Sequence, residues 1–184
     1  MPTQAEITLM KRRKRAAGSA IKFFTDVKEV RSANNPFDML SKTAKDDFYR
    51  LRGMTQNTIV GTFRVTAHTG MGNCDEKGRI CYAALSCNPL LLNTSEVTLC
   101  SAVGYDHVFV IVSDGAINGQ VFLSTLGVTA MVVDGWTQDW YFPNLGYITR
   151  ISQGLGKIPN PRQLYVRGQI EKHKLEYYGF VPDM

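Results

Sequence analysis

Three short apolar segments in the second half of the chain, separated by residues that favour turns, constrain the fold most. Residues 107–112 read HVFVIV, residues 121–125 read VFLST, and residues 128–134 read VTAMVVD. Runs of β-branched and aromatic residues of this length predict strands, and the SDGAINGQ sequence at 113–120 predicts a turn between the first two. We therefore expect an antiparallel sheet, whose apolar face needs a covering helix.

A helix that begins at Cys74 is the best candidate for that cover. It follows a glycine-broken turn in the sequence TGMGNCDEKGRICYAALS, residues 69–86. Asn73 is a competent N-cap, and the two acidic residues after Cys74 favour the first turn of a helix. The helix is expected to run to Leu85 and to bury one stripe, formed by Cys74, Gly78, Cys81 and Leu85. On that face Gly78 would let a neighbouring backbone approach closely.

The remaining segments complete a single α+β domain over residues 35–184. Apolar residues at helical spacing predict a helix that opens at Asn35-Pro36 and ends near Gly53, with the apolar positions Phe37, Leu40, Ala44, Phe48 and Leu51. The TIVGTFRV sequence at 58–65 predicts a strand, and residues 161–173 predict a helix near the C-terminus.

The net charge of +5 comes from one run of basic residues, Lys11, Arg12, Arg13, Lys14 and Arg15. Without that run, 16 basic residues balance 16 acidic ones, so the basicity belongs to the N-terminal residues 1–34. We expect these residues to form a flexible arm with at most a short helix near 20–30. Four interpretations stay open: contact with nucleic acid, contact with anionic lipid, a targeting address, or a solvated tail.

The chain has four cysteines and three histidines, and their number limits which metal sites and disulfides it can form. No CxxC pair occurs, which argues against a zinc site, and a disulfide framework is not expected at this chain length. Free thiols in a reducing compartment, with no metal or other cofactor, fit best. No apolar run reaches the ~20 residues of a membrane helix, and no apolar segment follows the basic residues as in a secretory signal peptide.

Three residues on these elements predict a nucleophilic site. A thiol at a helix N-terminus beside an imidazolium is readily deprotonated, and Cys74 has that position. His107 opens the strand HVFVIV, and Asp134 ends the strand VTAMVVD. If these strands are antiparallel neighbours, the start of one lies beside the end of the other, so Asp134 would orient His107. Each residue also has a structural explanation: a core cysteine, a strand histidine and a turn aspartate.

The order of the short motifs GNCDE, DHVFVIV, VVDGW and WYFPN resembles the papain-like cysteine protease effectors of bacterial pathogens, the YopT-type group. It is also similar to the related papain-fold toxin domains that deamidate glutamine. The resemblance covers about residues 70–143 and implies a papain-like core, in which the nucleophile-bearing helix packs on the antiparallel sheet. It implies a catalytic triad of Cys74, His107 and Asp134. Gly135 stands where such sequences commonly have proline.

The activity implied by the resemblance is acyl transfer on an amide of a host protein. Cysteine protease action and glutamine deamidation or transglutamination both fit, and a non-catalytic interaction module that works through the basic run is a third hypothesis. The Cys74 backbone N–H would be one oxyanion donor, and a second would come from Asn73, Gln56 or Asn57. Groove or lid residues would be Trp136, Trp140 and Tyr141. The resemblance also implies secretion into a host cell without a cleaved signal peptide, as a virulence effector.

Overall fold

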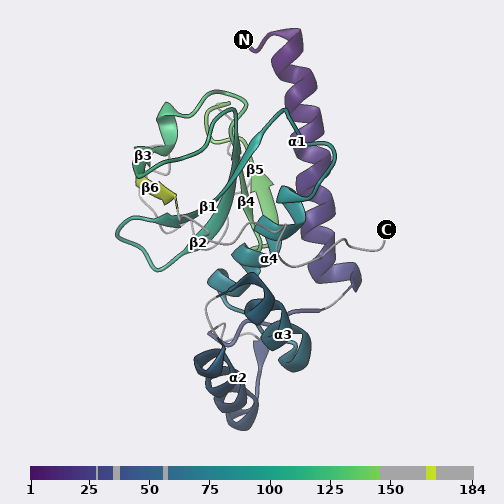
Figure 1. Cartoon of the computed structure of the whole chain (residues 1–184), viewed down its shortest axis with the longest axis vertical. Helices are drawn as coiled ribbons and strands as arrows, with labels where there is room; N and C mark the ends of the chain where they lie inside the picture. The colour runs from purple at the N-terminus through teal and green to yellow at the C-terminus, as the bar shows by residue number, and fades with distance from the viewer. Residues whose placement is uncertain (28, 35–37, 56–57, 146–164, 169–184) are drawn as a thin grey trace.

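The structure is a computed structural model, and it describes residues 1–27, 29–34, 38–55, 58–145 and 165–168. It combines helices with one antiparallel β-sheet, which is the expected α+β class. Figure 1 shows the long first helix beside the sheet, and two further helices below it at one end of the molecule. No described helix is long and apolar enough to cross a membrane.

The sheet has six strands in the order β3-β6-β1-β2-β4-β5, and every pair is antiparallel. The strands are β1 (Glu96–Ala102), β2 (Val108–Ser113), β3 (Gln120–Phe122), β4 (Met131–Asp134), β5 (Asp139–Tyr141) and β6 (Tyr165–Gly168). The three predicted strands correspond to β2, β3 and β4, although β3 gives way to a short 3-10 turn at Leu123–Thr125. The sequence did not lead us to expect β1 or β5. The helix expected over 161–173 is wrong at 165–168, where β6 pairs with β1 and β3.

Helices cover one face of the sheet, and residues of the β2–β3 turn and of the 3-10 turn after β3 pack on the other. The helices are α1 (Gln4–Lys22), α2 (Lys42–Met54), α3 (Ile59–Thr69) and α4 (Cys74–Ser86), and a π-helical turn (Phe23–Val27) follows α1. Alanines of α1 and apolar residues of α4 pack on alternate residues of β1, β2 and β4, such as Leu99, Val110 and Val133. The intervening strand residues face a second cluster with Ile117 and Leu123.

The helix at Cys74 has the predicted start and the predicted buried stripe. Cys81 and Leu85 are fully buried, and Cys74 is 9% exposed. A Cβ atom added to Gly78 would lie 3.0 Å from Val108 Cγ1 and 3.4 Å from Leu99 Cδ1. The expected close approach at Gly78 is therefore confirmed, and it brings α4 down onto β1 and β2.

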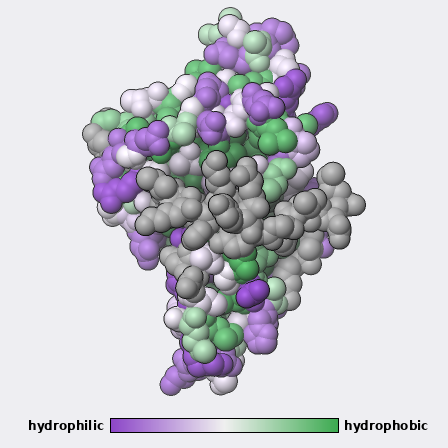
Figure 2. Space-filling view, viewed as in Figure 1, coloured by the Kyte–Doolittle hydropathy of each residue, from purple (hydrophilic) through white to green (hydrophobic). Residues whose placement is uncertain are grey.

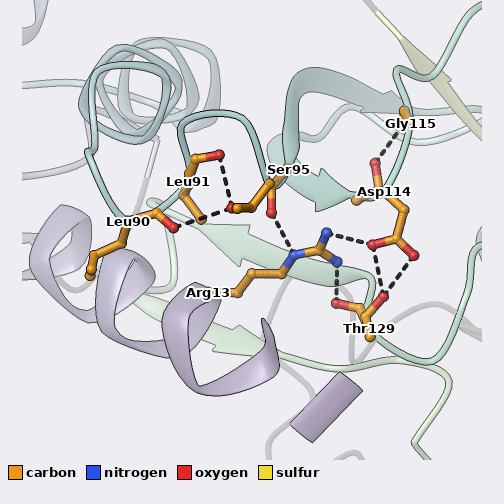
Figure 3. Close-up of polar contacts among 9 residues, drawn as sticks. Arg13, Leu90, Leu91, Ser95, Asp114, Gly115 and Thr129 are labelled. Atoms are coloured by element: carbon orange, nitrogen blue, oxygen red, sulfur yellow. Dashed lines mark hydrogen bonds and ion pairs between the residues drawn. The ribbon is translucent and has the colours of Figure 1, made fainter. Parts of the chain in front are cut away.

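The N-terminal residues differ from the expected arm, because residues 4–22 form a regular helix that is docked on the domain. Arg13 is fully buried. Its guanidinium donates hydrogen bonds to Ser95 Oγ at 2.9 Å, to the Thr129 carbonyl at 2.7 Å and to Asp114 at 2.6 Å (Figure 3). One residue of the basic run thus faces inward, where it joins α1 to the ends of three strands.

Two further expectations for the helical half need correction. Residues 58–65 form the first part of α3, not a strand: the Thr58 hydroxyl accepts a hydrogen bond from Gly61 N–H, and residues Ile59, Thr62, Val65 and Thr66 are buried at helical spacing. The upstream helix begins at Lys42 after the N-cap Ser41, whereas the predicted start at residues 35–37 lies outside the described residues. Phe48 is fully buried between α2 and α3, as its spacing predicted.

Candidate active site

The turn before Cys74 is held by a short parallel bridge to an upstream segment. Arg31 N–H donates to the Gly70 carbonyl at 2.9 Å, and Gly72 N–H donates to the Arg31 carbonyl at 2.8 Å. Gly70 has a φ of +67°, a conformation that glycine adopts without strain and that ends α3. These contacts fix where α4 begins and therefore where the thiol of Cys74 lies.

The strand register brings His107 and Asp134 together, as predicted from the sequence. Val110 pairs with Val133 in the antiparallel β2–β4 ladder, so the residues just before β2 lie beside the end of β4. His107 Nε2 lies 2.8 Å from Asp134 Oδ2. Both residues are buried, His107 to 7% exposure and Asp134 completely.

Cys74 lies near enough to the His107 ring to act on its pKa. Because Nε2 faces Asp134, the ring nitrogen left for the thiol is Nδ1. Burial alone lowers the pKa of His107, but the hydrogen bond to Asp134 and the neighbouring Cys74 outweigh it and raise the pKa to about 10. The raised pKa favours the imidazolium form of His107 beside Asp134.

Asp134 is held in one orientation by the backbone that follows it. Its Oδ1 accepts hydrogen bonds from Trp136 N–H at 2.9 Å and from Thr137 N–H at 3.3 Å, which leaves Oδ2 for His107. Gly135 lies against α4, where an added Cβ would be 2.8 Å from the Lys77 carbonyl oxygen and 2.9 Å from Cys81 Sγ. Any side chain at this position would push the end of β4 away from α4.

Cys74 opens onto a pocket of about 320 Å³. Its wall is largely polar and comes from four parts of the chain: the segment before α2, α2 itself, the start of α4, and the residues around the start of β2. The lining residues are Asn34, Arg52, Asn73, Cys74, Asp75, Arg79, Asp106 and Val108. A pocket of this size takes one side chain of a substrate rather than a folded surface.

Ion pairs tie α2 to the first turn of α4 beside this pocket. Arg52 Nε lies 2.7 Å from Glu76 and its Nη2 lies 3.7 Å from Asp75, while Arg79 Nε lies 3.2 Å from Asp75. Arg52 was not anticipated from the sequence, because no local motif connects it to a residue more than twenty positions away. Arg79 could have been suspected from its i,i+4 spacing to Asp75, but such a pair is typical of any exposed helix.

Asn73 caps α4 and faces the pocket. Glu76 accepts a hydrogen bond from Asn73 N–H at 2.9 Å, and the Asn73 side chain is turned toward the backbone N–H of Glu76, in the arrangement of a capping box. The oxyanion role expected for Asn73 would use the donor of this side chain, Nδ2.

A buried lysine lies one turn along α4 from the thiol. Lys77 is 3% exposed and its Nζ donates to Ser32 Oγ at 3.2 Å. Burial lowers the pKa of Lys77, while the nearby carboxylates of Asp38 and Asp134 act in the opposite direction. Lys77 was not anticipated from the sequence.

The remaining predicted site residues lie at three different places. Gln56 and Asn57 are outside the described residues. The Trp136 ring stands edge-on to His107, with centroids 5.8 Å apart, so it adjoins the site. Trp140 lies instead beside α1, with Lys14 Nζ 5.3 Å from its ring centroid, and Tyr141 is 3% exposed in the cluster on the opposite face of the sheet. The expectation that Trp140 and Tyr141 line the groove at Cys74 is not supported by their positions.

The other cysteines differ from Cys74 in their surroundings. Cys81 and Cys100 are fully buried, and burial raises the pKa of both thiols. Cys87 is exposed at the far end of α4. All four thiols are free, and the described part of the chain contains no group of three or more His, Cys, Asp or Glu side chains arranged to hold a metal ion.

Comparison with known proteins identifies no relative of this chain. No family model matches the chain, and neither a curated protein nor a solved structure matches it.

Proposed function

We propose that this chain is a thiol-dependent acyl-transfer hydrolase that uses Cys74, His107 and Asp134 as a catalytic triad. The observation that carries the proposal is the buried His107–Asp134 hydrogen bond of 2.8 Å, made by a histidine whose pKa is also raised by Cys74 at a helix N-terminus. Nucleophile, base and orienting acid are then neighbours in that order, which is the arrangement that activates a weak nucleophile.

In the proposed reaction His107 Nδ1 takes the thiol proton and Cys74 Sγ bonds to the carbonyl carbon of an amide. The resulting oxyanion is stabilised by the Cys74 backbone N–H, which has no partner within its own helix. Collapse breaks the C–N bond, and the imidazolium gives its proton to the leaving amine. His107 then takes a proton from water, whose oxygen attacks the thioester and releases the acid and the thiol. Asp134 stays ionised and holds the ring.

The resemblance of the motifs around these residues favours a papain-like core and a cysteine protease effector that acts on a host protein. The α+β fold is compatible with that proposal. The effector role and delivery into a host cell rest on the resemblance alone.

A glutamine deamidase is the second candidate, and the pocket favours it. About 320 Å³ accommodates a single side chain, and the polar lining, which includes Asn73 and Asp106, offers acceptors for the N–H of a primary amide. The same triad chemistry would then release ammonia in place of a peptide amine.

The first test is labelling of the folded chain with a thiol electrophile. We expect Cys74 to react faster than the exposed Cys87, and His107→Gln to remove that advantage. A Cys87→Ser variant serves as the matched control and should be labelled at Cys74 as the parent is. Equal labelling of Cys74 and Cys87 would overturn the assignment of the nucleophile.

The second test identifies the reaction by mass spectrometry of host-cell lysate incubated with the chain or with Cys74→Ala. New peptide termini that depend on Cys74 mean a protease, and a gain of about one mass unit on glutamine means a deamidase. Lysates that are identical for the parent and Cys74→Ala would contradict both and favour an interaction module.

A further inference from the structure

A second hollow, of about 310 Å³, lies between α1 and β5, away from Cys74. Lys11 and Lys14 are the charged residues of its wall. The rest of the wall is formed by Pro2, Ile7, Met10, Trp140, Phe142 and Leu145. Leu145 is 39% exposed at its edge, and Met1 beside Pro2 is fully exposed. The hollow therefore places exposed apolar side chains directly beside two cations.

The outer face of the same helix is strongly positive. Apart from Glu6 in its first turn, α1 contains no acidic residue. Arg13 is turned inward, and the exposed basic side chains of α1 are Lys11, Arg12, Lys14, Arg15 and Lys22. Figure 2 shows hydrophobic and hydrophilic atoms side by side at the end of the molecule where α1 begins. The basic face and the apolar hollow thus belong to one continuous surface.

We propose that this surface docks the chain on an anionic lipid bilayer. Lysine and arginine side chains on α1 would contact the lipid headgroups, and the hollow would receive acyl-chain carbons, with Trp140 at the boundary. Anionic headgroups attract clustered basic residues, and aromatic and apolar side chains beside them suit the membrane interface. A nucleic acid would use the same charges but would gain nothing from an apolar hollow, which is why the lipid is favoured.

Arg13 fixes the orientation of α1 on the folded domain. The hydrogen bonds to Ser95, Thr129 and Asp114 hold the helix by its inner face, so the hollow and the basic face stay presented outward. The docking surface is therefore built on the folded domain, and it does not require α1 to detach.

The test is co-sedimentation of the full chain with phosphatidylcholine vesicles, with and without phosphatidylserine. We expect binding only to the anionic vesicles, and a loss of affinity with added salt. Lys11→Gln/Arg12→Gln/Arg15→Gln should weaken binding roughly 100-fold, since each cation near such a surface contributes about fivefold. Ile7→Asn/Leu145→Asn should weaken it as well, because the hollow loses its apolar lining.

Two matched control variants test whether vesicle binding depends on this surface, and not on net charge or on exposed apolar side chains in general. Lys42→Gln/Arg50→Gln/Arg64→Gln removes the same charge from exposed positions on α2 and α3, and Met54→Asn/Leu92→Asn removes exposed apolar side chains elsewhere. Both should bind as the parent does.

Three results would overturn the proposal. The first is an equal loss of binding in the α2/α3 charge variant. The second is full binding by Ile7→Asn/Leu145→Asn: with an unchanged melting temperature it would mean that charge alone acts, and with a lowered one that the chain itself fills the hollow. The third is binding to a 20-base-pair DNA duplex without binding to vesicles, which would make the partner a nucleic acid.

Discussion

His107 connects the candidate site through its two ring nitrogens, which face different neighbours. Nε2 faces Asp134 at 2.8 Å, and Nδ1 is left for the nearby Cys74. A carboxylate can only accept, so it keeps a proton on Nε2 and leaves Nδ1 as the nitrogen that exchanges a proton with the thiol. Catalysis at this site would therefore depend on a hydrogen-bond acceptor standing opposite Nε2.

The Asp134→Asn variant tests that dependence. The amide oxygen of the new side chain can still accept from Trp136 and Thr137 N–H, so the turn should survive, but the amide N–H₂ would face Nε2 and favour the wrong tautomer. We expect the rate of thiol-dependent turnover to fall by a factor on the order of 10²–10⁴, as triad substitutions do. The melting temperature should stay near that of the parent. A variant that melts far lower would make Asp134 a structural turn residue, and Asp46→Asn on the exposed face of α2 is the control.

The charge on His107 should also appear in the pH dependence of stability. The pKa of His107 rises from the ordinary 6.5 to about 10 in the folded chain. A raised pKa in the folded state contributes stability that is fully present below pH 6.5 and is lost as the pH rises toward 10.

We therefore expect the free energy of unfolding of the parent, relative to that of His107→Gln, to fall as the pH rises from 6.5 to 10. Urea denaturation at several pH values measures it. A parent-to-variant difference that stays constant over this range would mean that His107 is not protonated in the folded chain.

At the scale of the elements, the site depends on how closely β4 approaches α4. Gly135 has no room for a Cβ, which would lie 2.8 Å from the Lys77 carbonyl oxygen. That carbonyl is helix backbone and cannot turn aside, so the strand end would have to move.

Gly135→Ala should therefore destabilise the chain by about 1–3 kcal/mol, the usual cost of overpacking. It should also slow labelling of Cys74, because Asp134 is the residue next to the displaced position. Chemical denaturation and labelling rates measure the two effects. Gly115→Ala is the matched control, since an added Cβ there meets nothing within 4 Å. If Gly135→Ala proves as stable and as reactive as Gly115→Ala, the close approach is unimportant.

The elements that could be predicted from the sequence are those with local signals. The Cys74 helix, the strand after His107 and the strand before Asp134 were predictable, because each has local signals: a cap, a β-branched run, and a glycine that ends the run. Their meeting followed from one assumption about pairing, which the β2–β4 register bears out.

The strand predicted at residues 58–65 is wrong for a physical reason. TIVGTFRV is β-branched and would suit a strand, but Thr58 caps a helix and burial at positions 59, 62, 65 and 66 offsets the weak intrinsic propensity. Arg52 and Lys77 were missed because their partners are brought to them by the tertiary fold.

For the whole molecule, Arg13 is the residue that joins the N-terminal helix to the sheet. Arg13→Met keeps much of the volume of the side chain but leaves the buried Thr129 carbonyl without its donor. We expect a loss of about 1–3 kcal/mol in the free energy of unfolding, the cost of an unsatisfied buried polar group. The exposed neighbour Arg12, replaced by methionine, should cost little. Equal stability of the two variants in chemical denaturation would show that the buried network contributes nothing.

The same contact has a consequence for the order in which the molecule can be completed during synthesis. Arg13 and Thr129 are separated by 116 positions, so α1 leaves the ribosome long before its acceptor exists. Until then its alanine face has no sheet to cover, and its cations are all in water. Closing so long a loop is slow relative to forming a helix. α1 is therefore translated before the strands that it covers but docks only after them, and a nascent chain halted before residue 129 would still present all five residues of its basic run.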